Sequence, residues 1–294
     1  MMSVRTVVKH KYKPDYWIRS CIAISKDTCI LLGSHLEKPG KFLILNEGNV
    51  RQLSYEIPQT RDDQRGALYK TETGFGCIFD TCIVEYDFSN DRFSEYLIEK
   101  PLPKDYAGRT TGPLGRASRL SDNQLLVPLE HYFFLFHASY MTTLSLRSDS
   151  GIFSPFIFSL KKSHPCCHLQ CSVAYIDDKT IFHRCAIADR KADHPDNYAE
   201  LCELKNGTVQ IISSTSVGRG SFASDNSCLM VKTRSKPFKF EIYSLNGEKE
   251  HVIPITPKRF LGNVDKWHLT FFDKFENTLW IASASDVTEI QLSL

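Results

Sequence analysis

Short apolar runs separated by polar turns repeat along the chain, and the pattern is clearest in residues 267–294. There the runs WHLTFFD, TLWIAS and VTEIQLSL are separated by the polar segments KFEN and ASD. Apolar runs of this length bounded by turn residues predict a three-stranded antiparallel meander. A sheet of three strands cannot bury both of its faces alone, so the pattern predicts neighbouring sheets of the same kind.

The same arrangement recurs upstream with a nearly constant period. The turns between the first and second strand of each meander are 46, 49, 56, 47 and 51 residues apart, and lie at Asp27, Thr73, Asp122, Asp178, Asp225 and Glu276. A period of about 50 residues is the size of one four-stranded blade of a β-propeller. The sequence therefore predicts an all-β fold, a single six-bladed β-propeller domain over residues 1–294.

Each predicted blade has about four antiparallel strands, and the blades are expected at 21–57, 67–98, 117–146, 171–213, 221–255 and 267–294. The third, for example, contains the runs ASRLS, QLLVPL, YFFLFHA and MTTLSL. The last has only three strands, whereas the β-branched segment Val4–His10 has the length of a strand and no partner. We expect this N-terminal strand to be the outer strand of the last blade, which removes an exposed sheet edge.

Composition and charge narrow the function classes only slightly. The chain has 294 residues, of which 42% are hydrophobic, and a net charge of +2, so no strong global field attracts a partner. We find no apolar signal-peptide core and no run of about 18 apolar residues, and we expect a cytoplasmic monomer that does not bind membranes.

Ten cysteines are present, and most lie in apolar runs of strand length. Those in such runs are Cys21, Cys29, Cys77, Cys82, Cys202 and Cys228. In a chain without a secretory signal, this placement favours reduced, buried thiols over disulfides.

A basic or potentially basic residue precedes the first strand of every predicted blade. These residues are Arg19, Arg65, Arg116, His168, Arg219 and Lys266. If the blades superpose, the six side chains form a ring around one mouth of the central channel, where arginine suits phosphate or carboxylate groups. The alternative is that they pair with acidic residues of the same loops, such as Asp62 and Asp265.

Aromatic residues accompany this predicted ring in the same loops. They include Tyr16, Trp17, Tyr106 and Trp267. Aromatic and basic side chains together stack on and neutralise single-stranded nucleic acid, and they are equally the usual anchors of protein interfaces. A third interpretation is that the rings pack the undersides of their own loops.

The densest group of metal-binding residue types is His164, Cys166, Cys167, His168 and Cys171. Zinc requires about four such ligands, but the spacing is not that of a CxxC knuckle and no second CxxC pair exists. A zinc site, a reactive thiol and ordinary packing are all compatible with these residues, and we expect no metal and no cofactor. The local motifs of hydrolases, P-loop proteins and metalloproteases are also absent.

These observations lead to one main hypothesis and two alternatives. The main hypothesis is a cytosolic protein-binding module that uses the basic, aromatic-rich loops at one channel mouth. The first alternative is an enzyme that acts on an anionic or phosphorylated small molecule in a pocket at the same mouth. The second is a protein that binds single-stranded RNA there.

Overall fold

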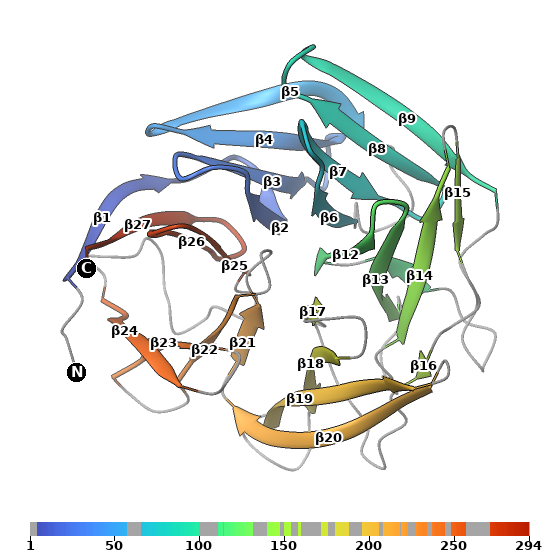
Figure 1. The fold of residues 1–294 in the computed structure, drawn as a ribbon. Coiled ribbons are helices and arrows are strands. Elements are labelled where there is room, and N and C mark those ends of the chain that lie inside the picture. The colour runs from blue at the N-terminus through green and yellow to red at the C-terminus, as the bar shows by residue number, and fades with distance from the viewer. Residues whose placement is uncertain are drawn as a thin grey trace. The chain divides into compact units, whose positions relative to one another are not determined.

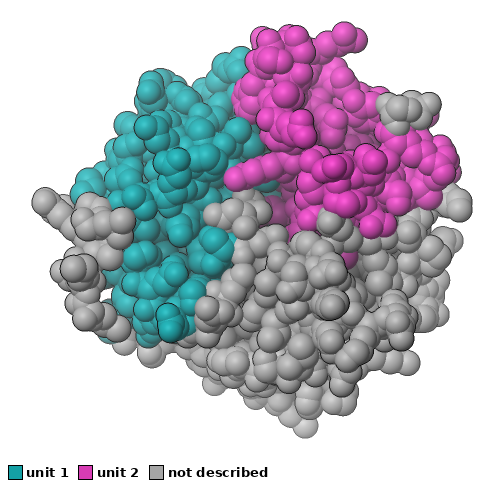
Figure 2. All heavy atoms as spheres, viewed as in Figure 1, with its two compact units in different colours: residues 1–64, 218–294 teal, residues 65–217 magenta. Residues whose placement is uncertain are grey.

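The computed structural model describes residues 5–57, 66–99, 111–113, 115–131, 140–147, 150–153, 158–159, 172–175, 180–187, 196–205, 208–217, 219–222, 227–233, 237–244, 248–256 and 271–293. Within these ranges every helix or strand assigned is a β-strand, so the predicted all-β class is confirmed (Figure 1). The described residues contain no helix that could span a bilayer. Figure 2 shows two compact units, one of residues 1–64 and 218–294 and one of residues 65–217.

The discontinuous unit contains two sheets whose strands follow one another in chain order. One sheet consists of β2 (Trp17–Ala23), β3 (Thr28–Ser34), β4 (Gly40–Asn46) and β5 (Asn49–Ile57). The other consists of β21 (Arg219–Phe222), β22 (Cys228–Lys232), β23 (Lys239–Ser244) and β24 (Lys249–Pro254). The strands expected in residues 21–57 and 221–255 lie in these two antiparallel meanders.

The third sheet of this unit joins the two ends of the chain. Its strand order is β1 (Arg5–Tyr12), β27 (Val287–Ser293), β26 (Thr278–Ala282) and β25 (Phe271–Phe275). β1 lies antiparallel to β27, in a register that runs from Arg5 opposite Ser293 to Tyr12 opposite Val287, with a bulge between Val8 and His10 (Figure 1). The N-terminal strand therefore pairs beside the last strand of the chain, as expected from the sequence.

In the sheet of β1, β27, β26 and β25, the inner strands β26 and β27 are largely buried on both faces. Phe272 and Ile281 pack in a core cluster with residues of β22, β23 and β24, whereas Phe271 and Trp280 pack in a second cluster with residues of β2, β3 and β4. Successive side chains of a strand point to opposite faces of its sheet, so a sheet between two others needs apolar residues at consecutive positions. This explains why the whole run TLWIA of β26 is buried.

The contiguous unit begins with strands that do not form the two separate blades expected at 67–98 and 117–146. Its strands belong to one 11-stranded sheet: β6 (Ala67–Lys70), β7 (Gly74–Ile78), β8 (Cys82–Asp87), β9 (Arg92–Ile98), β10 (Thr111–Pro113), β11 (Gly115–Arg116), β12 (Ser118–Ser121), β13 (Gln124–His131), β14 (Tyr140–Leu146), β15 (Ser150–Phe153) and β16 (Phe158–Ser159). Two short parallel ladders, β15 with β9 and β11 with β6, connect the expected blades. Residues from both parts share one core, so the sheet curves back on itself.

The strand order expected within residues 117–146 is also wrong. The apolar run of residues 132–138 was expected to form a strand between QLLVPL and MTTLSL, but β13 pairs directly with β14, from Gln124 opposite Ser145 to Leu129 opposite Tyr140. Residues 132–139 lie outside the described residues. The strands β15 and β16 come from residues between the expected blades 117–146 and 171–213, and both pair with β14. β15 lies between β14 and β9 in the sheet.

The contiguous unit ends in a four-stranded antiparallel sheet. Its strands, in order, are β17 (Ser172–Tyr175), β18 (Thr180–Ile187), β19 (Asp196–Lys205) and β20 (Thr208–Val217). The strands expected in residues 171–213 lie in this sheet. The number of blades stays a prediction, because two of the six expected blades share one sheet.

The described thiols are expected to be unreactive in the folded protein. Cys21, Cys29, Cys77, Cys82 and Cys228 are buried and form no disulfide. Burial raises the pKa of the Cys77 thiol well above its usual value and that of Cys82 to about 11, so neither forms much of the reactive thiolate near neutral pH. Iodoacetamide at about pH 8 should leave these five unmodified until urea is added, as peptide mass spectrometry can show. Rapid labelling of Cys77 or Cys82 without denaturant would contradict this.

Candidate functional site

The structure brings together two of the predicted site residues, Trp17 and Arg19, at one end of β2. Trp17 is 47% exposed and lies opposite Ser34 of β3. A bulge at Arg19 separates the pairs Ile18–Gly33 and Ser20–Leu32, and such a bulge redirects a side chain at the end of a strand. The Arg19 Nε donates a hydrogen bond to the Ser34 hydroxyl over 2.7 Å, and its guanidinium carbon lies 5.8 Å from the centre of the Trp17 ring. Arg19 therefore holds the exposed indole from one side.

The connection between β3 and β4 completes this surface. The Tyr16 ring is only 7% exposed and meets the His35 ring edge-on at 5.8 Å. The Glu37 backbone N–H donates to His35 Nδ1 over 3.0 Å, which fixes the imidazole. Leu36, in the same connection, is 76% exposed. Tyr16 was expected to contact a partner, but its low exposure makes it a support for its neighbours.

We call the group Trp17, Arg19, Ser34, His35 and Leu36 the Trp17 surface. Gly33 allows Tyr16 to pack beneath it, because a Cβ at position 33 would lie only 2.8 Å from the Tyr16 Cβ. The rings of Tyr16 and His35 therefore limit the movement of the backbone that carries Trp17. An exposed aromatic on a rigid strand end, with arginine beside it, is typical of a binding anchor.

The strand that carries this surface, β2, is hydrogen-bonded to the neighbouring sheet that contains β1. The Ile18 N–H donates to the Ala284 carbonyl over 2.7 Å, and the Ala23 N–H donates to Asp273 Oδ2 over 2.6 Å. Asp273 is fully buried in β25, so its carboxylate satisfies a backbone donor of β2 that would otherwise lack one in the core. β2 is thus fixed to the neighbouring sheet near both of its ends.

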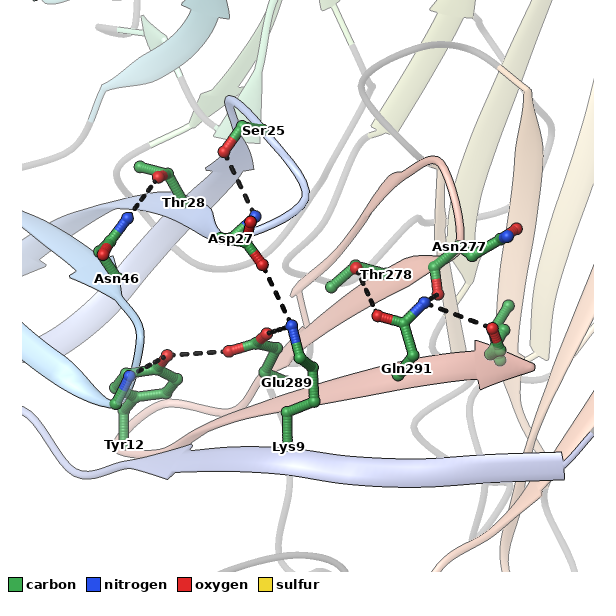
Figure 3. Close-up of polar contacts among 12 residues, drawn as sticks. Lys9, Tyr12, Ser25, Asp27, Thr28, Asn46, Asn277, Thr278, Glu289 and Gln291 are labelled. Atoms are coloured by element: carbon green, nitrogen blue, oxygen red, sulfur yellow. Dashed lines mark hydrogen bonds and ion pairs between the residues drawn. The ribbon is translucent and has the colours of Figure 1, made fainter.

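A buried carboxylate fastens β1 in the same region (Figure 3). Lys9 and Tyr12 both point from β1 toward Glu289 of β27, whose side chain is 1% exposed. The Tyr12 hydroxyl donates to Glu289 Oε2 over 2.9 Å and accepts the Gly48 N–H over 3.1 Å. The Lys9 ammonium lies 3.3 Å from Glu289 Oε1 and 3.1 Å from Asp27 Oδ1. β1 is therefore linked to β27, to the β2–β3 turn and to the β4–β5 turn.

The two donors of this network titrate at high pH. The hydrogen bond to Asp27 and the contacts with Glu289 raise the pKa of Lys9 above its usual 10.5, although burial opposes the shift. Burial and then the neighbouring Glu289 raise the pKa of Tyr12 well above its usual 10.0. A pKa that is higher in the folded state gives stability that is complete below the unfolded pKa and is lost as the pH rises through the folded pKa.

We therefore expect the protein to lose stability as the pH rises above about 10, with part of this loss due to Tyr12. The Tyr12→Phe variant keeps the ring but removes the titrating hydroxyl. Urea midpoints between about pH 8 and pH 11 should fall less steeply for Tyr12→Phe than for the wild-type protein. Equal slopes would show that Tyr12 does not contribute to the alkaline loss.

The expected ring of basic residues stays a prediction. Arg116 lies in β11, where it pairs with Leu68 of β6, and it belongs to a different compact unit from Arg19. Arg219 is the first residue of β21 and lies opposite Lys232, whose ammonium is 4.7 Å from the Phe238 ring centre. The other predicted binding residues lie outside the described residues: Arg65, Tyr106, His168, Lys266 and Trp267.

The predicted metal-binding candidates fall in a part of the chain that the structure does not describe. His164, Cys166, Cys167, His168 and Cys171 all lie in the range 160–171, outside the described residues. Across the ranges that the structure describes, no group of three or more histidine, cysteine, aspartate or glutamate residues is arranged to hold a metal ion.

Comparison with known proteins relies on structure alone. No protein-family model matches the chain, and no curated protein matches it by sequence. A chain in the crystal structure of the mitotic checkpoint complex aligns with a TM-score of 0.51 at 12% identity, over 99% of this chain and 93% of that one. The β-propeller domain of Cps50 (Swd1) from Myceliophteria thermophila aligns with a TM-score of 0.47 at 8% identity, over 97% and 98% of the two chains. The structural neighbours are β-propellers. TolB from Acinetobacter baumannii aligns with a TM-score of 0.42 at 13% identity, over 86% of this chain and 60% of that one.

Proposed function

We propose that this chain is a cytosolic six-bladed propeller that acts as a protein-interaction module and binds its partner through the Trp17 surface. The observation that carries the proposal is the exposed Trp17 indole, which Arg19 holds beside Ser34. The other described tryptophan, Trp280, is fully buried in the core. Tryptophan and arginine are the residue types most enriched among the few that dominate binding free energy at protein interfaces.

Two further observations support a protein partner. Leu36 adds a second exposed apolar side chain in the connection that follows Ser34, the residue paired with Trp17. The structurally similar chain with a TM-score of 0.51 belongs to the mitotic checkpoint complex. The partner offers an apolar side chain to Trp17 and Leu36, and a hydrogen-bond acceptor at the rim near Arg19.

The proposal is tested by comparing two single variants that each truncate an exposed apolar side chain, one on the Trp17 surface and one elsewhere on the same sheet. Trp17→Ala removes the anchor, whereas Val50→Ala shortens a 42% exposed apolar side chain on the outer strand of the same sheet. Both variants should keep the fold, because the two side chains are about half exposed and neither belongs to the core clusters of this unit. Partners captured from the native host by the wild-type protein are then purified, and their affinities for both variants are measured.

We expect Trp17→Ala to weaken partner binding at least about tenfold and Val50→Ala to leave it unchanged. Equal affinity for the wild-type protein and Trp17→Ala would overturn the assignment of the surface. The two alternatives have different signatures. Binding to single-stranded RNA would fall steeply with salt concentration, whereas an interface anchored by an aromatic residue is much less sensitive to salt. An enzyme would instead need a concave pocket with converging polar groups at this surface.

A further inference from the structure

We infer that the pairing of β1 with β27 holds the Trp17 surface in its binding form, with Glu289 as the positioning residue. Partner binding and closure of the N-terminal strand then stabilise one another. This inference rests on the proposed function, because it concerns the regulation of the same surface. The conformational link joins the Trp17 surface to Glu289, which lies in the last strand of the sequence.

A short path along the chain connects β1 to the Trp17 surface. Only residues 13–16 separate Tyr12, the last residue of β1, from Trp17, the first residue of β2. Tyr12 and Tyr16 are both buried in the core cluster that also contains Trp280. The Tyr12 and Trp280 ring centres are 5.9 Å apart. The segment that leads into Trp17 is thus packed at both of its ends.

Hydrogen bonds on both sides of Trp17 join the chain to the same sheet, the one that contains β26 and β27. On the N-terminal side, the Tyr12 hydroxyl bonds to Glu289 of β27. On the C-terminal side, the Ile18 N–H bonds to the carbonyl of Ala284, which lies between β26 and β27. The position of the indole therefore depends on a sheet to which Trp17 does not itself belong. Loss of the first attachment leaves the Tyr12 hydroxyl bonded to the Gly48 N–H but no longer to the side chain of β27.

A single carboxylate, that of Glu289, contacts two side chains of β1, Lys9 and Tyr12. Glu289 accepts from the Tyr12 hydroxyl through one oxygen and pairs with the Lys9 ammonium through the other. The bulge between Val8 and His10 places an extra residue, Lys9, at this point of the strand. A buried carboxylate with both oxygens engaged makes a strong local contribution, which is lost when its charge is removed.

The chain contains a matched control for this arrangement. Glu241 of β23 also accepts from a tyrosine hydroxyl and a lysine ammonium, Tyr243 over 2.6 Å and Lys249 over 2.8 Å. All three residues lie in β23 and β24, whose sheet contains neither β1 nor β2. Glu289→Gln and Glu241→Gln therefore remove the same charge from the same kind of contact at two different places.

The test is hydrogen–deuterium exchange of the free full-length protein, followed by mass spectrometry. We expect Glu289→Gln to speed exchange at least about tenfold in residues 6–12 and also in residues 17–20, including the Ile18 amide. Glu241→Gln should change neither segment. Faster exchange in residues 6–12 with unchanged exchange in residues 17–20 would overturn the inference, and so would no change in either segment. If Glu289→Gln does not fold, Tyr12→Phe replaces it, because this substitution removes only the hydroxyl contact. The exchange rates of residues 6–12 and 17–20 are then compared in the same way.

A second measurement separates this inference from the proposed function. Coupling between two sites is reciprocal, so a bound partner that prefers the closed form of the N-terminal strand should slow exchange in residues 6–12. If Trp17→Ala leaves partner binding unchanged but Glu289→Gln still speeds exchange in residues 17–20, the surface assignment fails and the conformational link stands. If the partner binds through Trp17 but residues 6–12 exchange at an unchanged rate, the link fails and the proposed function stands.

Discussion

Deletion of residues 1–12 should destabilise the protein more than the loss of any one side chain that contacts Glu289. It removes the whole of β1 and exposes the edge of β27, which is then free to pair with other chains. It also removes Tyr12, a fully packed side chain whose loss alone should cost about 3–5 kcal/mol, as for other large aromatic residues in cores. Urea unfolding and light scattering should show a lower midpoint and aggregation.

The same deletion offers a control for non-specific damage. A synthetic peptide of residues 1–12, added to the truncated protein, should bind the open edge and raise the urea midpoint in a concentration-dependent manner. A peptide of the same composition in scrambled order should have no effect, because it cannot place Lys9 and Tyr12 beside Glu289. An unchanged midpoint after truncation would contradict the role assigned to β1.

The Gly74→Ala substitution should disrupt the 11-stranded sheet by backbone collision. A Cβ at this position would lie 1.9 Å from the Tyr86 carbonyl oxygen, where no real Cβ is found. Gly74 is paired with Asp87 of β8, so the obstacle is the neighbouring backbone and not a side chain that can rotate away. We expect a loss of about 3 kcal/mol, the upper end of the usual range for overpacked sites.

Glu72→Ala is the matched control for this substitution. Glu72 is exposed and lies two residues before Gly74, so its truncation should change the free energy of unfolding by no more than about 0.5 kcal/mol. Urea unfolding of the two variants should therefore differ clearly. Equal stabilities would mean that β7 and β8 separate at this point at little cost.

Prediction from the sequence was accurate where side chains alone determine the strands. The runs of residues 17–57 and 271–293 have buried faces and turn residues at their ends, and both signals are local. The connection between the two expected blades of residues 67–146 depends on backbone pairing of Ser150 and Gly151 with Leu97 and Ile98. A ladder of two pairs carries no side-chain pattern, so periodicity could not detect it.

The candidate site was predictable in part for the same reason. Trp17 and Arg19 were expected just before the first strand and lie within it, in β2. The same argument selected Tyr16, which is buried. The sequence alone does not distinguish a buried aromatic residue from an exposed one. Tyr16 is buried because its ring packs against His35, a contact that the sequence does not reveal. Only one sequence feature pointed to the exposure of Leu36, namely its position as an apolar residue within a polar turn. The contact of Lys9 with Glu289 joins two ends of the chain that no local pattern connects.

The pairing of the two chain ends has a consequence for biosynthesis. Tyr12 and its partner Glu289 are 277 residues apart, and a ribosome that adds about 5–20 residues per second needs roughly 14–55 s to make the intervening chain. During this interval the N-terminal strand has left the ribosome before β27 exists. The compact unit of residues 65–217 is contiguous and has been synthesised by then, whereas the unit that carries the Trp17 surface needs the last residues of the chain. The nascent protein therefore acquires its proposed binding surface only after residues 287–293 have been synthesised.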